Sequence, residues 1–295
     1  NYRAPVEDMS FVLNEMLDLE RICAMEAFSE VTPDLVSHVL KGAAKFAEDA
    51  VAPLNHVGDK QGARLENGVV RMPDGFVECH KQYVKAGWGS ITGESKYGGQ
   101  NLPWTVGIAV SEMWQAANMA LANAWMLTQG AIEAIQVHGT AEQKATYLPK
   151  LISGEWSGTM NLTEPNAGSD VGALKTKAVP EDGAWRISGT KIFITHGDQD
   201  MTENVIHLVL ARTPGAPEGT KGISLFIVPK FDVEQTGKLG TRNDLRVVSL
   251  EHKLGHMASP TAVMSYGDNG GATGFLLGEE NQGMACMFTM MNNAR

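Results

Sequence analysis

A chain of 295 residues, 43% of them hydrophobic, is long enough to bury two separate cores, so we expect two main domains. Its formal charge of −10 argues against a nucleic-acid partner, because such binding depends on basic side chains that neutralise phosphate. The cysteines, Cys23, Cys79 and Cys286, are odd in number and far apart, which favours reduced thiols in the cytoplasm over a disulfide framework. No apolar run is long enough to cross a bilayer, so we expect a cytoplasmic protein without a membrane partner.

The first part of the chain is typical of helices. Thr32 and Pro33 form a helix start, and apolar residues then repeat at helical spacing until Pro53, where we expect the helix to end. The segment 54–102 is rich in glycine and turn residues. It is predicted to be mostly loop, with a short extended piece at 69–72.

Three further helices are predicted before the middle of the chain. The first opens at Pro103 and the second covers about 122–137. Thr140 and Gln143 form a capping box for the third, which we expect Pro149 to interrupt. Residues 1–158 are therefore predicted to be an N-terminal all-helical domain.

Near Gly154 the helical spacing gives way to short apolar runs separated by Gly, Pro, Asp and Asn. These runs predict strands at 156–162, 184–187, 191–195, 205–211, 223–228, 246–250 and 262–266, with a hairpin turn at 181–183. Because no helices intervene, we expect an antiparallel β-sandwich or barrel over 159–280.

Residues 281–295 return to a helical pattern, with Met284, Met287 and Met291 on one face. An isolated helix with such a face would lack a partner to bury it. These residues are therefore predicted to be the first turns of a C-terminal helical domain that is truncated at Arg295.

The most informative segment is 160–170, which reads Met-Asn-Leu-Thr-Glu-Pro-Asn-Ala-Gly-Ser-Asp. Proline fixes the backbone, glycine permits a tight turn, and Thr163 and Ser169 add hydroxyl groups. Successive N–H groups in such a turn form a concave nest for a polar or anionic ligand edge. Taken singly, each of these residues fits a surface turn better.

A second segment, Lys191-Ile192-Phe193-Ile194-Thr195, reads as a strand that ends in a hydroxyl. A flavin ring needs an apolar or aromatic face to pack on, and donors along its edge where negative charge appears on reduction. Phe193 offers the face, and the loop before Asp170 offers donors. We therefore predict that the two segments together bind an isoalloxazine.

These two segments closely resemble the acyl-CoA dehydrogenase family, and the resemblance spans nearly the whole chain. Further matches lie at Tyr97–Gln100, at Lys253–Gly255 and at Leu277–Met284. The opening residues 2–9 and the long sheet region are similar to a longer bacterial branch of that family.

The resemblance implies FAD contacts at Met160, Leu162, Thr163, Gly168, Ser169, Phe193 and Thr195. It implies contacts to the acyl-CoA substrate at Ser169, Asn292 and Arg295. Many relatives carry tryptophan where this chain has Phe193, and aspartate is common at the position of Asn292.

The resemblance also implies α,β-dehydrogenation of an acyl-CoA thioester, with electrons passed from FAD to an electron-transferring flavoprotein, and a homodimer or homotetramer. The family's base glutamate occupies one of two positions: the first is Ala294 here, and the second lies beyond Arg295. We therefore expect no catalytic residue within this chain, which would be an inactive fragment. Glu164 is better interpreted as a loop anchor that accepts N–H bonds than as a substitute base.

Two other functions fit the same residues. One is an acyl-CoA oxidase, which returns electrons to oxygen; the other is a non-catalytic binding or interaction module that keeps the fold. A zinc site at His252 and His256 is disfavoured, because no thiol or carboxylate accompanies them at ligand spacing.

Overall fold

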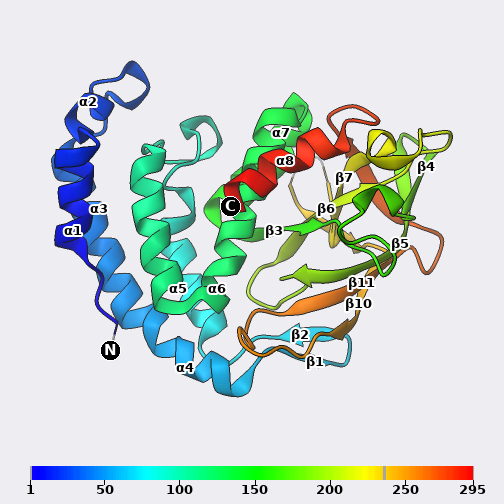
Figure 1. Cartoon of the computed structure of the whole chain (residues 1–295), viewed down its shortest axis with the longest axis horizontal. Coiled ribbons are helices and arrows are strands. Elements are labelled where there is room, and N and C mark those ends of the chain that lie inside the picture. The colour runs from blue at the N-terminus through cyan, green and yellow to red at the C-terminus, as the bar shows by residue number, and fades with distance from the viewer. Residues whose placement is uncertain (1, 235–236, 295) are drawn as a thin grey trace.

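The structure is a computed structural model that describes residues 2–234 and 237–294. Helices gather at one end of the molecule and a curled sheet at the other, with α6 between them (Figure 1). The helices before the sheet are α1 (Val6–Phe11), α2 (Leu19–Cys23), α3 (Pro33–Phe46), α4 (Ala52–Gln61), α5 (Phe76–Lys85), α6 (Trp104–His138) and α7 (Ala141–Ser153).

Both predicted helix-capping sites, at Thr32 and Thr140, are confirmed. Thr32 Oγ1 accepts a hydrogen bond of 3.1 Å from the N–H of Leu35, and Pro33 occupies the first turn of α3. Thr140 and Gln143 form the reciprocal bonds of a capping box at the start of α7. Each pair satisfies backbone N–H groups that have no acceptor within the helix.

Both predicted helix breaks are wrong. Pro53 lies in the first turn of α4, after a π-helical turn at Ala47–Val51, where a missing N–H costs no hydrogen bond. Pro149 lies inside α7, whose apolar face stays buried through Leu148, Leu151 and Ile152. Tertiary burial of that face outweighs the bond lost at the proline.

The prediction that 54–102 is mostly loop is also wrong. This segment contains most of α4, all of α5, and a hairpin of β1 (Arg64–Glu66) and β2 (Val69–Arg71). α5 buries Phe76, Cys79, His80 and Tyr83 on one face, and this burial stabilises a helix that its turn-rich flanks obscure.

The two helices predicted after Pro103 form the single element α6, which is kinked at Asn118 (φ −161°, ψ 89°). The Asn118 side chain accepts a bond of 3.2 Å from the N–H of Leu121. It therefore acts as an N-cap in the interior of the element and restarts the helix after the kink.

Eight strands in the described part form one sheet, in the order β10-β11-β5-β12-β7-β6-β3 with β4 paired to β5. Their bounds are β3 (Trp156–Asn161), β4 (Lys177–Glu181), β5 (Ala184–Thr195), β6 (Asn204–Ala211), β7 (Ser224–Pro229), β10 (Leu245–Leu250), β11 (Thr261–Tyr266) and β12 (Ala272–Leu277). The helical region followed by a mostly antiparallel, curled sheet confirms the predicted fold class. One pair differs, because β3 and β6 run parallel.

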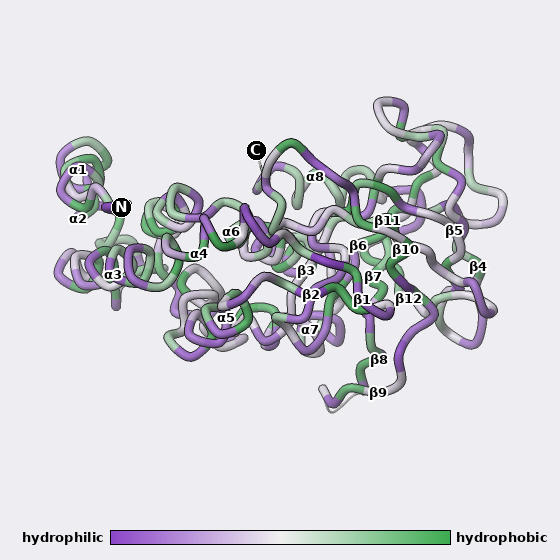
Figure 2. The backbone as a smooth tube through the Cα atoms, turned by 90° about the horizontal axis from the view of Figure 1, so that it is seen from below, coloured by the Kyte–Doolittle hydropathy of each residue, from purple (hydrophilic) through white to green (hydrophobic). Residues whose placement is uncertain are grey.

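Other details of the sheet differ from prediction. β5 joins two predicted strands, and β4, β12 and the hairpin of β8 (Phe231–Val233) and β9 (Leu239–Arg242) were not predicted. Figure 2 shows this hairpin projecting from the rest of the molecule. The predicted turn between β4 and β5 is confirmed: Asp182 and Gly183 both have positive φ, 50° and 79°.

The helical and sheet regions share buried contacts. One apolar cluster combines α6 and α7 with β3, β6 and β7, and includes residues of α8 (Gly283–Ala294). A Cβ at Gly130 of α6 would lie 3.0 Å from Met290 Cγ of α8, so the glycine permits close approach of the two helices. None of the described helices, the 35-residue α6 included, has the combination of length and apolarity needed to cross a membrane.

Candidate active site

The two segments that the sequence singles out lie side by side in the fold. The N–H of Ile192 in β5 donates to the carbonyl oxygen of Thr163 over 2.8 Å. The ammonium of Lys191 donates to the carbonyl oxygen of Leu162 over 2.9 Å. The loop after β3 is therefore attached to β5 by two consecutive carbonyl groups.

A buried ion pair supports this attachment. Lys191 Nζ lies 2.9 Å from Glu164 Oε1, and the side chains are 0% and 3% exposed. Glu164 also accepts bonds from the N–H groups of Lys175 and Thr176 and from the Thr176 hydroxyl. Burial acts to raise the pKa of Glu164, but the Lys191 ammonium and these donors outweigh it and lower that pKa. The carboxylate is thus ionised and occupied, which confirms its predicted role as a loop anchor.

Phe193 projects from an irregular point of β5. The register of β5 against β11 shifts between Ala262 and Met264, so two residues of β5, Ile192 and Phe193, face one residue of β11. Phe193 has φ 60°, a left-handed conformation that is unfavourable for an aromatic residue, and 58% of it is exposed. The bulge therefore directs a large apolar side chain towards solvent instead of the sheet core.

Thr195 lies at the end of β5, where its carbonyl oxygen accepts a bond of 2.7 Å from the Thr159 hydroxyl. Met160 and Leu162 are half-buried and pack against the cluster shared by α6, α7 and the sheet. Gly168 and Ser169 are exposed in the loop, and nothing lies within 4 Å of a Cβ built on Gly168. This leaves open space beside the loop.

Arg212 contributes to this region although no sequence motif includes it. Its guanidinium donates to the carbonyl oxygens of Leu174, Pro217, Gly219 and Gly172. It thereby joins the segment after Asp170 to the loop that follows β6. An arginine at the end of a buried strand is a signal for such a clamp, but its acceptors are backbone groups that a sequence does not identify.

A cavity of about 850 Å³ lies beside α6, and its lining places Asn292 near aromatic side chains. Its lining includes residues 292–294 at the end of α8 and the tryptophans Trp88, Trp104, Trp114 and Trp125. The proposed flavin residues do not contribute to this lining. Arg295, the other predicted substrate contact, lies outside the described residues.

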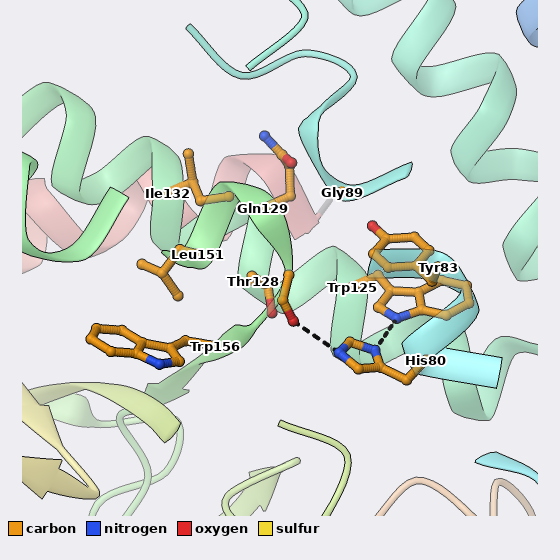
Figure 3. Close-up of a pocket in the computed structure, with 10 residues that line it drawn as sticks. His80, Tyr83, Gly89, Trp125, Thr128, Gln129, Ile132, Leu151 and Trp156 are labelled. Carbon is orange, nitrogen blue, oxygen red and sulfur yellow. Dashed lines mark hydrogen bonds between the residues drawn. The ribbon is translucent and has the colours of Figure 1, made fainter. Parts of the chain in front are cut away.

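A second, water-sized cavity of about 10 Å³ adjoins His80 (Figure 3). Trp125 Nε1 donates to His80 Nδ1 over 3.1 Å, and His80 Nε2 lies 2.9 Å from the Gly154 carbonyl oxygen. These partners require the neutral tautomer with its proton on Nε2, and burial lowers the pKa of His80. The Tyr83 and Trp125 rings stack with centroids 4.1 Å apart, so the group packs α5 against α6.

The geometry defines a helical region joined to a curled antiparallel sheet whose strand-end loops present an aromatic face and free donors. Residues 36–155 match the acyl-CoA dehydrogenase N-terminal domain, and residues 159–269 match the middle domain. The chain belongs to the acyl-CoA dehydrogenase family.

Several relatives match along the whole chain. Over 295 residues it is 50% identical to 3-methylmercaptopropionyl-CoA dehydrogenase of Ruegeria pomeroyi, covering 100% of this chain and 50% of that protein. Over 304 residues it is 41% identical to the broad-specificity linear acyl-CoA dehydrogenase FadE5 of Mycobacterium tuberculosis, covering 100% of this chain and 49% of that protein. The chain therefore spans about half the length of the curated relatives it matches.

Solved structures show the same fold. The acyl-CoA dehydrogenase of Geobacillus kaustophilus superimposes with a TM-score of 0.69 at 25% identity, over 87% of this chain and 62% of that one. Butyryl-CoA dehydrogenase of Megasphaera elsdenii also has a TM-score of 0.69, at 24% identity over 89% of this chain and 63% of that one.

Proposed function

We propose that this chain forms the N-terminal and sheet regions of an FAD-dependent acyl-CoA dehydrogenase. One observation carries the proposal: the loop after β3 is attached to β5, and the two segments carry an exposed aromatic ring at Phe193 and unpaired donors at Thr163. Among the described residues, neither the N–H nor the hydroxyl of Thr163 has a hydrogen-bond partner. Such donors beside Phe193 fit the edge and the face of an isoalloxazine.

In this proposal, the residues of the chain bind FAD and the substrate and orient the flavin ring. Phe193 and Thr195 flank the ring, and the backbone of Met160 and Leu162, with Thr163, Gly168 and Ser169, supplies the edge contacts. When FAD is bound, its flavin ring would accept the hydride from the substrate β-carbon. Ser169, Asn292 and Arg295 are assigned to the acyl-CoA side.

The proton at the substrate α-carbon needs a base, and Glu164 is unsuitable because its carboxylate is occupied by four donors. The family position on α8 holds Ala294, which cannot accept a proton. We therefore assign the base to sequence beyond this chain, together with the contacts for electron-transferring flavoprotein and for assembly as a homodimer or homotetramer.

Replacing Phe193 with glycine tests the flavin site. Glycine adopts φ 60° without strain, and the exposed ring contributes little packing, so the free energy of unfolding should change by less than about 1 kcal/mol. FAD affinity should fall roughly tenfold or more, because about 1.5 kcal/mol of apolar contact is lost. Titration of the apoprotein with FAD, followed by flavin absorbance, measures this; unchanged affinity would remove Phe193 from the site.

The reaction is tested with the complete product of the gene that encodes this chain. Anaerobic addition of a panel of acyl-CoA thioesters should bleach the bound flavin, and electron-transferring flavoprotein should reoxidise it. Rapid reoxidation by air alone would favour an acyl-CoA oxidase instead. A complete protein that takes up no FAD would favour a non-catalytic module.

A further inference from the structure

Lys191 carries a buried charge, and its position indicates a role beyond attaching the loop after β3 to β5. Its side chain is 0% exposed, and its ammonium donates to the Leu162 carbonyl oxygen and to Glu164 Oε1, each over 2.9 Å. Replacing a buried ion pair by neutral side chains of similar volume is often neutral or stabilising. Stability alone therefore gives no reason for a lysine here.

The carbonyl that Lys191 contacts belongs to the same peptide unit as the N–H of Thr163. All described peptide bonds are trans, so the two groups of this unit point in opposite directions. With the carbonyl oxygen held at Lys191, the Thr163 N–H is directed away from the ion pair. It finds no acceptor within residues 2–234 and 237–294.

A cation bonded to a carbonyl oxygen also polarises the whole peptide unit. Hydrogen bonds in a chain strengthen one another in a low-dielectric interior, so the N–H on the far side becomes a stronger donor. The next peptide unit is fixed as well, because the Thr163 carbonyl accepts from Ile192 and the Glu164 N–H donates to Ala167. The donor at Thr163 is thus oriented from both sides.

We propose that Lys191 is a positioning residue whose ammonium, through the Leu162–Thr163 peptide, orients and strengthens a donor to the edge of bound flavin that becomes negative on reduction. The inference rests on the proposed FAD site. A stronger donor at that edge favours the reduced flavin over the oxidised form. Lys191 would therefore raise the reduction potential of the bound cofactor without touching it.

The test compares neutral variants with a matched control in the complete gene product. Lys191→Met/Glu164→Gln removes both charges and the bond to Leu162, whereas Lys191→Gln/Glu164→Gln removes both charges and retains an amide donor at residue 191. The control is Lys230→Met/Asp198→Asn, which neutralises another buried lysine–carboxylate pair of the sheet region, with Nζ and Oδ1 2.6 Å apart. That pair has no hydrogen bond to the loop after β3 or to Phe193.

The expected result is a lower potential in the first double variant, by about 30 mV, which corresponds to a tenfold change in the preference for reduced over oxidised flavin. Lys191→Gln/Glu164→Gln should give a smaller decrease, and the control should match the wild-type potential. Circular dichroism checks folding; if the first double variant does not fold, Lys191→Gln/Glu164→Gln decides alone. A potential equal to wild type in every folded Lys191 variant would overturn the proposal and leave Lys191 a structural residue.

A failure of the proposed FAD site gives a different result from a failure of the role proposed for Lys191. If the folded wild-type protein takes up no FAD, the flavin site itself is wrong, and the inference falls with it. If wild type binds FAD and both neutral pairs shift the potential equally, general charge in the sheet region is responsible, which also overturns the specific role of Lys191.

Discussion

Two buried histidines of the sheet region, His196 and His207, are held in their neutral form. His207 in β6 is 0% exposed, its Nε2 has no partner among the described residues, and its Nδ1 lies 3.5 Å from Asn161 Nδ2. His196, 1% exposed, donates from Nε2 to the Ala120 carbonyl oxygen of α6 over 3.1 Å. Burial lowers the pKa of His196 to about 4 and that of His207 to about 3. Both are therefore neutral in the folded protein at neutral pH.

These histidines predict a loss of stability in acid. In the unfolded chain a histidine has a pKa of about 6.5, so the unfolded state binds protons that the folded state excludes as pH falls from about 6.5 towards 4. The free energy of unfolding is thus fully retained above about pH 6.5 and decreases below it. Each histidine contributes a loss on the order of 3 kcal/mol by pH 4.

Replacing His207 with leucine isolates one of these contributions. We expect stability near pH 7 to change by less than about 1 kcal/mol, because one ring nitrogen is unpaired and the other makes a long contact. The decrease between about pH 6.5 and 4.5 should become shallower than in wild type. Urea unfolding across that range measures both, and an equally steep decrease would contradict the assignment.

At the scale of elements, the contact between α6 and β3 determines where the loop after β3 begins. Gly158 of β3 lies against Ala131 of α6: a Cβ at residue 158 would approach the Ala131 Cβ to 2.3 Å. The N–H of Gly158 also donates to the Thr128 hydroxyl over 3.1 Å. Because β3 packs this closely against α6, Met160 near its end and the adjacent Leu162 have a defined position.

Gly158→Ala should therefore destabilise the fold by about 1–3 kcal/mol, because the helix and strand must separate to admit the methyl group. Gly255→Ala is the control, since nothing lies within 4 Å of a Cβ there and its φ is not left-handed. The control should change stability by less than about 0.5 kcal/mol. Equal unfolding midpoints in urea for the two variants would contradict the close contact.

At the scale of the whole molecule, the helical and sheet regions are joined at more than one place. The hairpin β1–β2 leaves the helical region and lies beside β10, where Val70 is buried in the core of the sheet (Figure 1). Asp200 accepts a bond of 3.0 Å from the Met72 N–H and pairs with Arg71. The two cores therefore share side chains and are expected to unfold together.

Calorimetry of the chain should show one unfolding transition, and tryptophan fluorescence should follow the same curve. Val70→Ala should lower the free energy of unfolding by about 2 kcal/mol through a cavity in the sheet core, without splitting the transition. Two resolved transitions in the wild-type chain would contradict a shared core.

The fold class and the two loops of the candidate site were predictable, because local chemistry specifies them. The capping residues at Thr32 and Thr140 and the Asp182-Gly183 turn act within a few residues of themselves. The helix at 76–85 and the continuity across Pro53 and Pro149 were not predictable, since burial against distant elements decides them.

The sequence by itself determined the helical region, the change to short strands and the residues that resemble a flavin site, because periodicity and turn chemistry are local properties. Only the tertiary structure decided that Leu162 and Thr163 are attached to β5, that Glu164 is occupied by four donors, and that Phe193 projects from a bulge. Those facts depend on pairing of β5 with the loop after β3, about 30 residues away, and with β11, about 70 residues away, which the residue pattern of a single segment does not specify.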